Sequence, residues 1–249
     1  MEIPVILLEK LAEAQHVAVL TGAGVSAESG IKTFRDTDGL WAQFNPMELA
    51  SVNGFMSNPD LVWSWYQHRI EIVNQANPNP GHFAIAEMEK NFPKFTLITQ
   101  NVDRLHHRAG SSNILELHGN IVENHCSDCK KQYNGETVLP DKQLPRCPHC
   151  GGKIRPSVVW FGEMLPQEAL QASEEAAYNC DVFFSVGTSA EVYPAANLPT
   201  LAKRSGAFVV EVNPNVTQLS SFVDVRLATP SGIALPKMLE EFKKFKSFK

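Results

Sequence analysis

Four cysteines in two closely spaced pairs are the strongest chemical signal in this 249-residue sequence. Cys126 and Cys129 form one Cys-x-x-Cys pair, and Cys147 and Cys150 form the other. Each pair can aim two thiolates at one ion, and four thiolates complete the tetrahedral shell of a zinc ion without leaving a position for substrate. The spacing therefore predicts one structural zinc ion, and a redox role for either pair is the less favoured alternative. The fifth cysteine, Cys180, is expected to pack in the core.

A glycine-rich segment follows an apolar run near the N-terminus. Gly22, Ala23 and Gly24 come after residues 16–20, and Ser26 follows them at the start of an expected helix. Glycines let a backbone approach a diphosphate, and the free N–H groups of a helix start face its charge. The segment therefore predicts a dinucleotide site. Because its spacing differs from Gly-x-Gly-x-x-Gly, a tight structural turn is kept as the alternative.

Polar side chains follow three more expected strands. In an open α/β sheet, ligands bind just beyond the carboxyl ends of the strands. Asx turns are the alternative for each group alone, but several polar strand ends together favour a nucleotide cleft. The residues are Gln100, Asn101 and Asp103; Gly187, Thr188 and Ser189; and Asn213 and Asn215.

His118 ends the apolar run 114–117, just before the cysteine-rich segment. A lone histidine is most often structural. This one lies at the expected seam between two modules, where clefts form, and its ordinary pKa of about 6.5 suits a general base. We therefore take His118 as the candidate catalytic base.

Tyr66 and Arg69 stand three residues apart on an expected helix over residues 59–77. That spacing places both on one helix face, where a phenol and a guanidinium can converge on one anion. The alternative is a core tyrosine beside a surface arginine paired with glutamate.

Strands alternating with helices position these groups. Such alternation predicts an α/β fold, a Rossmann-like parallel sheet covered by helices on both faces. Strands are expected at residues 16–20, 95–99, 114–117, 158–161, 182–186, 208–212 and 223–227, and helices at 59–77, 80–91, 167–178, 194–203 and 231–246.

The cysteine-rich segment divides the chain into two modules. We expect a zinc-ribbon-like, zinc-binding module at residues 125–155, inserted in a nucleotide-binding domain of residues 1–124 and 156–249. Residues 33–58 are expected to form a cofactor loop with a small helical part.

Composition restricts the classes of protein. Apolar residues make up 43% and charged residues 20%, which is typical of a globular protein. The net charge of −5 argues against binding nucleic acid through bulk charge. No apolar run approaches the roughly 18 residues of a membrane span. We expect a cytoplasmic monomer with no specific nucleic-acid partner and no membrane partner.

Taken in order, these motifs resemble the sirtuins, the NAD-dependent protein lysine deacylases. The resemblance runs from about Val17 to Pro236 and departs at Lys32, where the family usually has proline. Its motifs are the segment from Gly22 to Phe34 and Arg35, the segment from Thr99 to His106, His118-Gly119, the four cysteines, Gly187 to Ser189, and Val212 to Pro214.

The resemblance implies that NAD is consumed as a co-substrate beside one structural zinc ion. The acyl oxygen of the substrate attacks the anomeric carbon as nicotinamide leaves, and His118, with Asn101 beside it, is the catalytic residue that activates a ribose hydroxyl. The implied NAD-binding residues are Gly22, Ala23, Gly24, Ser26, Phe34, Arg35, Trp41, Gln100, Asn101, Asp103, Gly187, Thr188, Ser189, Asn213, Asn215 and Ser231.

The implied substrate is an acylated lysine in a protein or peptide, bound as an added strand by Val159, Phe161, Gly162 and Val192. Tyr66 and Arg69 match the branch that removes succinyl and malonyl groups, and Ala50 matches its small pocket residue. The resemblance thus implies a deacetylase that also acts as a desuccinylase and demalonylase, and that transfers the acyl group to ADP-ribose.

Two rival functions are weighed against this one. A mono-ADP-ribosyltransferase would use the same NAD site but modify a protein nucleophile. A zinc-ribbon module would grip nucleic acid through the basic stretch 130–155 and would use NAD only as a sensor.

Overall fold

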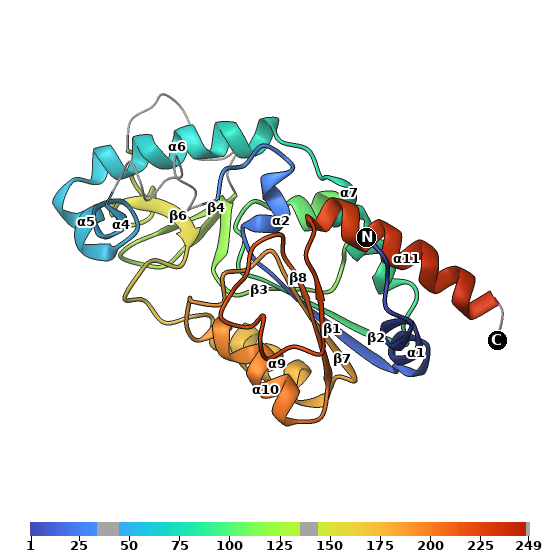
Figure 1. The fold of residues 1–249 in the computed structure, drawn as a ribbon. Coiled ribbons are helices and arrows are strands. Elements are labelled where there is room, and N and C mark those ends of the chain that lie inside the picture. The colour runs from blue at the N-terminus through green and yellow to red at the C-terminus, as the bar shows by residue number, and fades with distance from the viewer. Residues whose placement is uncertain (34–44, 135–143, 248–249) are drawn as a thin grey trace.

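A parallel six-stranded sheet forms the centre of the computed structural model, which describes residues 1–33, 45–134 and 144–247 (Figure 1). All pairings between its neighbouring strands are parallel, which confirms the predicted fold class. The strands lie in the order β3 (Ile114–Glu116), β2 (Lys94–Thr99), β1 (His16–Thr21), β7 (Val182–Val186), β8 (Phe208–Val212) and β9 (Val225–Leu227).

The strand order reverses direction at β1. From β1 the chain proceeds to β2 and β3 on one side, and then to β7, β8 and β9 on the other. Because β1 and β7 are neighbours, the loops that leave them start side by side at the carboxyl edge of the sheet, before the chain continues to β2 in one direction and to β8 in the other. In open parallel sheets this switch point is where ligands bind.

Helices cover both faces of the sheet because its central strands are buried on both sides. Val17 and Val19 of β1 pack in the cluster formed with α1 (Val5–Glu13), α7 (Pro80–Glu89) and α11 (Ser231–Ser247). Ala18 and Leu20, which point the other way, pack with α9 (Gln167–Asn179) and α10 (Leu198–Arg204). The turn η2 (Ala195–Asn197) precedes α10. All of these helices except α1, which was not expected, agree with the expected periodicity.

A small antiparallel sheet carries the cysteine-rich segment. Its order is β5 (Gln132–Asn134), β4 (Gly119–Cys126) and β6 (Ile154–Val158). The expected strand over 158–161 is wrong, because the strand ends at Val158 and belongs to this second sheet. Beyond it the backbone leaves the sheet, and Phe161 N–H donates to the Ala50 carbonyl at 2.8 Å. The predicted module boundaries at residues 125 and 155 stay a prediction.

Three helices stand beside the small sheet: α4 (Pro46–Leu49), α5 (Val52–Ser57) and α6 (Pro59–Gln75). Each begins at a side chain that accepts from a backbone N–H of the first turn: Asn45, Ser51 and Asn58. Two four-residue helices, α2 (Gly24–Ala27) and α8 (Leu105–Arg108), lie in the loops after β1 and β2. In the described part of the chain, no helix is both long and apolar enough to cross a membrane.

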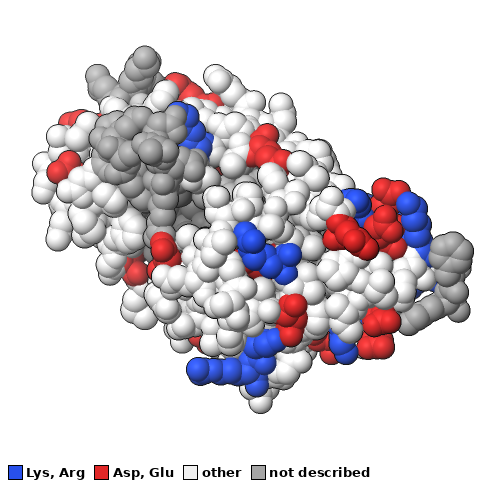
Figure 2. All heavy atoms as spheres, viewed as in Figure 1, with Lys and Arg blue, Asp and Glu red and all other residues white. Residues whose placement is uncertain are grey.

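Positive and negative side chains are interspersed over the described surface on the face drawn in Figure 2. Arg155 of the basic stretch is buried and forms two hydrogen bonds to Glu163, at 2.9 and 2.7 Å. A guanidinium held in this way cannot contact a phosphate. The nucleic-acid alternative therefore loses one of the basic side chains on which it depends.

Candidate active site

The loops after β1 and β7 meet backbone to backbone at the switch point. Gly22 N–H donates to the Val186 carbonyl at 3.0 Å, and Gly24 N–H donates to the Gly187 carbonyl at 2.8 Å. A Cβ on Gly24 would lie 2.7 Å from the Gly187 oxygen, closer than real Cβ atoms come. Close packing between the two loops therefore requires these glycines, a reason that sequence reasoning did not supply.

Ser26 links the glycine-rich turn to the loop after β2. Its hydroxyl donates to Asp103 Oδ2 at 2.7 Å and accepts from Asn101 Nδ2 at 3.1 Å. Asp103 also accepts from Leu105 N–H at 2.9 Å. Burial raises the pKa of Asp103, against the lowering effect of these hydrogen bonds. The structure thus joins three predicted residues in one buried network.

His82 completes this network and was missed in the sequence. Its Nδ1 accepts from Asn79 N–H at 3.2 Å, so in the neutral ring Nε2 carries the proton and faces Ser26 Oγ at 3.4 Å. Burial lowers the pKa of His82 to about 4, which keeps the ring neutral. The signal was available: Asn79 followed by proline and, three residues on, His82 is a helix start in which both side chains cap.

The loops after β2, β7 and β8 are joined through Thr188. Gln100 Nε2 donates to Thr188 Oγ1 at 3.2 Å, and Asn213 Nδ2 donates to the Thr188 carbonyl at 3.1 Å. Asn215 N–H donates in turn to Asn213 Oδ1 at 3.0 Å. Gly187 and Ser189 lie beside Thr188, and Gly187 also contacts the loop after β1. The ends of β1, β2, β7 and β8 therefore meet at the edge where a dinucleotide is expected.

Ser231 lies at the start of α11, in a different set of contacts. Its hydroxyl donates to Glu28 Oε2 at 3.4 Å, and Gly232 N–H donates to the same oxygen at 2.7 Å. Phe34, Arg35 and Trp41 lie outside the described residues.

His118 stands in the turn between β3 and β4. The Gln100 carbonyl can only accept, so the hydrogen bond of 3.0 Å makes His118 Nδ1 the donor and leaves the lone pair of the neutral ring on Nε2. Burial lowers the pKa of His118, against the raising effect of the bond to Gln100. The ring is therefore a neutral base with a defined tautomer at neutral pH.

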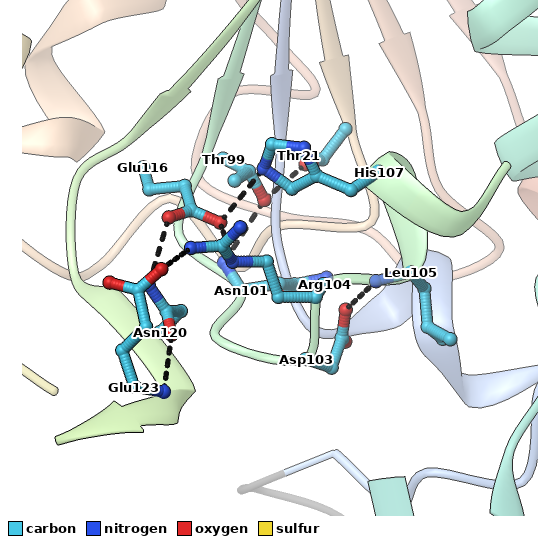
Figure 3. Close-up of polar contacts among 10 residues, drawn as sticks. All are labelled: Thr21, Thr99, Asn101, Asp103, Arg104, Leu105, His107, Glu116, Asn120 and Glu123. Atoms are coloured by element: carbon cyan, nitrogen blue, oxygen red, sulfur yellow. Dashed lines mark hydrogen bonds and ion pairs between the residues drawn. The ribbon is translucent and has the colours of Figure 1, made fainter. Parts of the chain in front are cut away.

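A charged cluster ties the Asn101–Asp103 loop to the strands that flank His118 (Figure 3). Arg104 forms ion pairs with Glu116 of β3, at 3.0 Å, and with Glu123 of β4. Asn120 Nδ2 donates to Glu116 and its oxygen accepts from Glu123 N–H. Arg104 lies in the recognised segment from Thr99 to His106, but its pairing with Glu116 could not be predicted, because that pairing depends on the fold.

The backbone at Arg104 has φ of 60°, a left-handed conformation that glycine adopts without strain. We therefore predict that Arg104→Gly keeps the backbone conformation of the loop but removes the ion pairs with Glu116 and Glu123. Catalytic efficiency should fall on the order of tenfold because the reacting groups are misplaced. The measurement is kcat/KM together with the melting temperature. Equal kcat/KM in the wild-type protein and in Arg104→Gly would contradict a positioning role for Arg104.

Tyr66, Arg69 and Ala50 gather beside the small sheet. Tyr66 is 3% exposed and Arg69 is 8% exposed, so Arg69 is not the surface residue of the alternative interpretation. Ala50 and Tyr66 pack in the same apolar cluster, with Val102 of the loop after β2 against it. The Arg69 guanidinium lies 4.9 Å from the centre of the Trp65 ring.

The expected peptide-binding residues lie in two segments. Val159 N–H donates to the His118 carbonyl at 2.9 Å, and Phe161, which is 45% exposed, pairs with Ser51 as an isolated parallel bridge. Gly162 has φ of 86°, which turns the chain after Phe161. Val192 belongs to the second segment, ahead of η2, where its carbonyl accepts from Ala196 N–H.

The four cysteines form a single cluster in the described part of the chain. Their sulfurs all lie within 4.8 Å of one another. Cys126 and Cys150 Sγ are 3.5 Å apart, and Cys129 and Cys147 Sγ are 3.7 Å apart. Four sulfurs at about 2.3 Å from a zinc ion stand about 3.8 Å from each other. The cluster therefore fits zinc, as its spacing predicts.

Comparisons with known proteins agree with this arrangement. Residues 22–194 match a family model described as "Sir2 family". An NAD-dependent protein deacylase of Methylococcus capsulatus is 48% identical over 246 residues, which cover 96% of each chain. One from Ralstonia nicotianae is 51% identical over 227 residues, covering 91% of this chain and 92% of the relative.

Solved structures are similar over nearly the whole chain. A Sir2 homologue in complex with NAD superposes with a TM-score of 0.92 at 43% identity, covering 98% of this chain and 95% of that one. A Sir2–p53 peptide–NAD⁺ complex superposes with a TM-score of 0.88 at 34% identity, covering 98% and 100%.

Proposed function

The chain belongs to the Sir2 family and is an NAD-dependent protein deacylase; from this we propose that it removes acetyl, succinyl and malonyl groups from lysine side chains. The acyl group is transferred to ADP-ribose, so the products are nicotinamide, O-acyl-ADP-ribose and free lysine. The observation that carries the acidic acyl preference is the burial of Tyr66 and Arg69 on one face of α6, next to the small side chain of Ala50.

NAD, when bound, supplies the ADP-ribose that receives the acyl group. The switch point of the sheet and its polar loops fit a dinucleotide. We assign Gly22, Ala23 and Gly24, with Thr188 and Ser189, to the diphosphate and the adjoining ribose. Asn213 and Asn215 serve the adenosine end, with Ser231 assigned to the adenine. Asn101 and Asp103 of the Ser26 network, together with Gln100, serve the nicotinamide ribose and nicotinamide pocket.

His118 is the general base. Its Nδ1–H is held by the Gln100 carbonyl, so Nε2 is available to take a proton from a ribose hydroxyl. Gln100 also contacts Thr188 of the proposed diphosphate site, and it therefore connects the base to the nucleotide.

The acylated lysine is expected to enter between the segments that carry Val159 and Val192. The segment with Phe161 and Gly162 and the segment with Val192 would bind the peptide as an added strand, a mode that recognises main chain rather than side chains. The complex of a Sir2 protein with a p53 peptide supports a peptide substrate of this kind.

Mass spectrometry of the products tests the reaction. We expect equal amounts of nicotinamide, O-acyl-ADP-ribose and free lysine from acetyl- and succinyl-lysine peptides with NAD. ADP-ribosylated protein in place of O-acyl-ADP-ribose would support the transferase alternative instead.

Arg69→Met tests the acyl pocket. Loss of a charge-assisted bond to the distal carboxylate is expected to lower kcat/KM for succinyl-lysine about 10- to 150-fold relative to acetyl-lysine. The acetyl-lysine peptide of the same sequence is the internal control. Equal losses on both peptides would mean that Arg69 stabilises the fold and does not bind the acyl group.

A further inference from the structure

Trp160 and Tyr66 share a hydrogen bond whose direction is fixed by chemistry. The indole nitrogen of Trp160 lies 2.7 Å from the Tyr66 hydroxyl oxygen. An indole N–H can only donate, so the tyrosine oxygen accepts and its own proton points elsewhere. Within the described ranges, no residue accepts that proton.

The indole is held in place from both sides. The Arg155 guanidinium lies 3.6 Å from the centre of the Trp160 ring, and the Phe55 ring centre is 5.2 Å away. Glu163 binds Arg155 through both carboxylate oxygens and also accepts from the backbone N–H of Trp160 at 2.9 Å. With its side chain 2% exposed, Trp160 has little freedom to turn its N–H away from Tyr66.

Tyr66 keeps the proton that this bond directs. Burial raises the pKa of Tyr66 to about 12, so the hydroxyl is a donor throughout the neutral range. Arg69, three residues further along α6, lowers that pKa in opposition to burial. The buried phenol and guanidinium thus share one face of the helix, and both are hydrogen-bond donors.

We propose that Trp160 is a positioning residue for acyl specificity: by donating to the Tyr66 oxygen, it directs the Tyr66 hydroxyl proton toward the distal carboxylate of succinyl- or malonyl-lysine. This inference rests on the proposed function, because it requires an acidic acyl group beside Arg69. It assigns to the segment after β6 a part in selecting the acyl chain, separate from binding the peptide backbone.

Trp160→Phe tests the proposal, since it removes the N–H donor and retains an aromatic ring. The measured quantity is the ratio of kcat/KM for succinyl-lysine to that for butyryl-lysine. The butyryl group has the same number of carbons, with a methyl group in place of the distal carboxylate. We expect the ratio to fall about three- to tenfold, as for the loss of one neutral hydrogen bond.

Trp63→Phe is the matched control. Trp63 lies on α6, is 1% exposed, and its indole nitrogen has no hydrogen-bond partner in the described structure. The same substitution there creates a similar cavity but breaks no hydrogen bond, so the ratio should not change. A fall equal to that of Trp160→Phe would attribute the effect to packing and overturn the proposal.

Tyr66→Phe provides a second route if Trp160→Phe does not fold. It should lower the ratio at least as much as Trp160→Phe, and in the double variant the tryptophan substitution should have no further effect. An unchanged ratio in Tyr66→Phe, or additive losses in the double variant, would overturn the proposal. If the wild-type protein does not turn over succinyl-lysine, the proposed function fails; if it does and Arg69→Met alone lowers the ratio, only the role of Trp160 fails.

Discussion

Replacing His118 with asparagine is expected to lower kcat/KM for acyl-lysine about 10²- to 10⁴-fold, the usual contribution of a positioned base. An asparagine amide can still donate to the Gln100 carbonyl, which His118 Nδ1 contacts at 3.0 Å. What the variant lacks is the lone pair on Nε2. The loss should therefore appear in catalysis, while the dissociation constant of NAD, measured by calorimetry, stays nearly the same.

The pH profile gives an independent check on the same residue. Burial lowers the pKa of His118 below its ordinary value of 6.5, and a base acts only when deprotonated. Activity should thus rise with pH through this lowered pKa, with its midpoint below pH 6.5, and reach a plateau above it. The His118→Asn variant should lose that rise. A wild-type profile that climbs steadily from pH 7 to 9 would place the titrating base elsewhere.

The sheet could be predicted because its signal is local. Runs such as residues 182–184 are continuously apolar, and β7 contains that run with every residue buried. The run 158–161 gave the same local signal but forms no strand of the main sheet. There Trp160 is committed to contacts with Phe55 and Tyr66, which are distant in sequence. Long-range contacts of this kind override a local pattern.

The site residues also differ in how far they could be predicted from the sequence. Zinc ligands and the glycine-rich turn are recognisable because their residue types and spacing are restricted by coordination and close backbone approach. The sequence marks His82 only as part of a helix start, and the contacts made by Arg104 and Trp160 carry no such restriction. Their roles arise from partners on other elements, such as Ser26, Glu116 and Tyr66, and sequence spacing contains no information on those distances.

Loss of the zinc site is expected to abolish activity by releasing His118. β4 begins directly after His118 and ends at Cys126, and the His118 carbonyl accepts from Val159 N–H just beyond β6. Structural zinc sites contribute roughly 10–16 kcal/mol of apparent binding free energy, as much as a whole domain's stability of about 5–15 kcal/mol. A small sheet tied together by four thiolates cannot remain folded without the ion, so the turn that holds the base should lose its geometry.

Cys147→Ala and Cys180→Ala together make this prediction specific. Both cysteines are buried, but only Cys147 belongs to the cluster, where its Sγ also lies within hydrogen-bond distance of the Tyr133 hydroxyl oxygen, at 2.9 Å. We expect Cys147→Ala to lose bound zinc, lower the melting temperature and lose deacylation, and Cys180→Ala to keep one zinc ion per chain and its activity. Metal content by mass spectrometry, thermal unfolding and kcat/KM are the measurements. A zinc-free Cys147→Ala protein with wild-type activity would show that the geometry of His118 does not depend on the metal site.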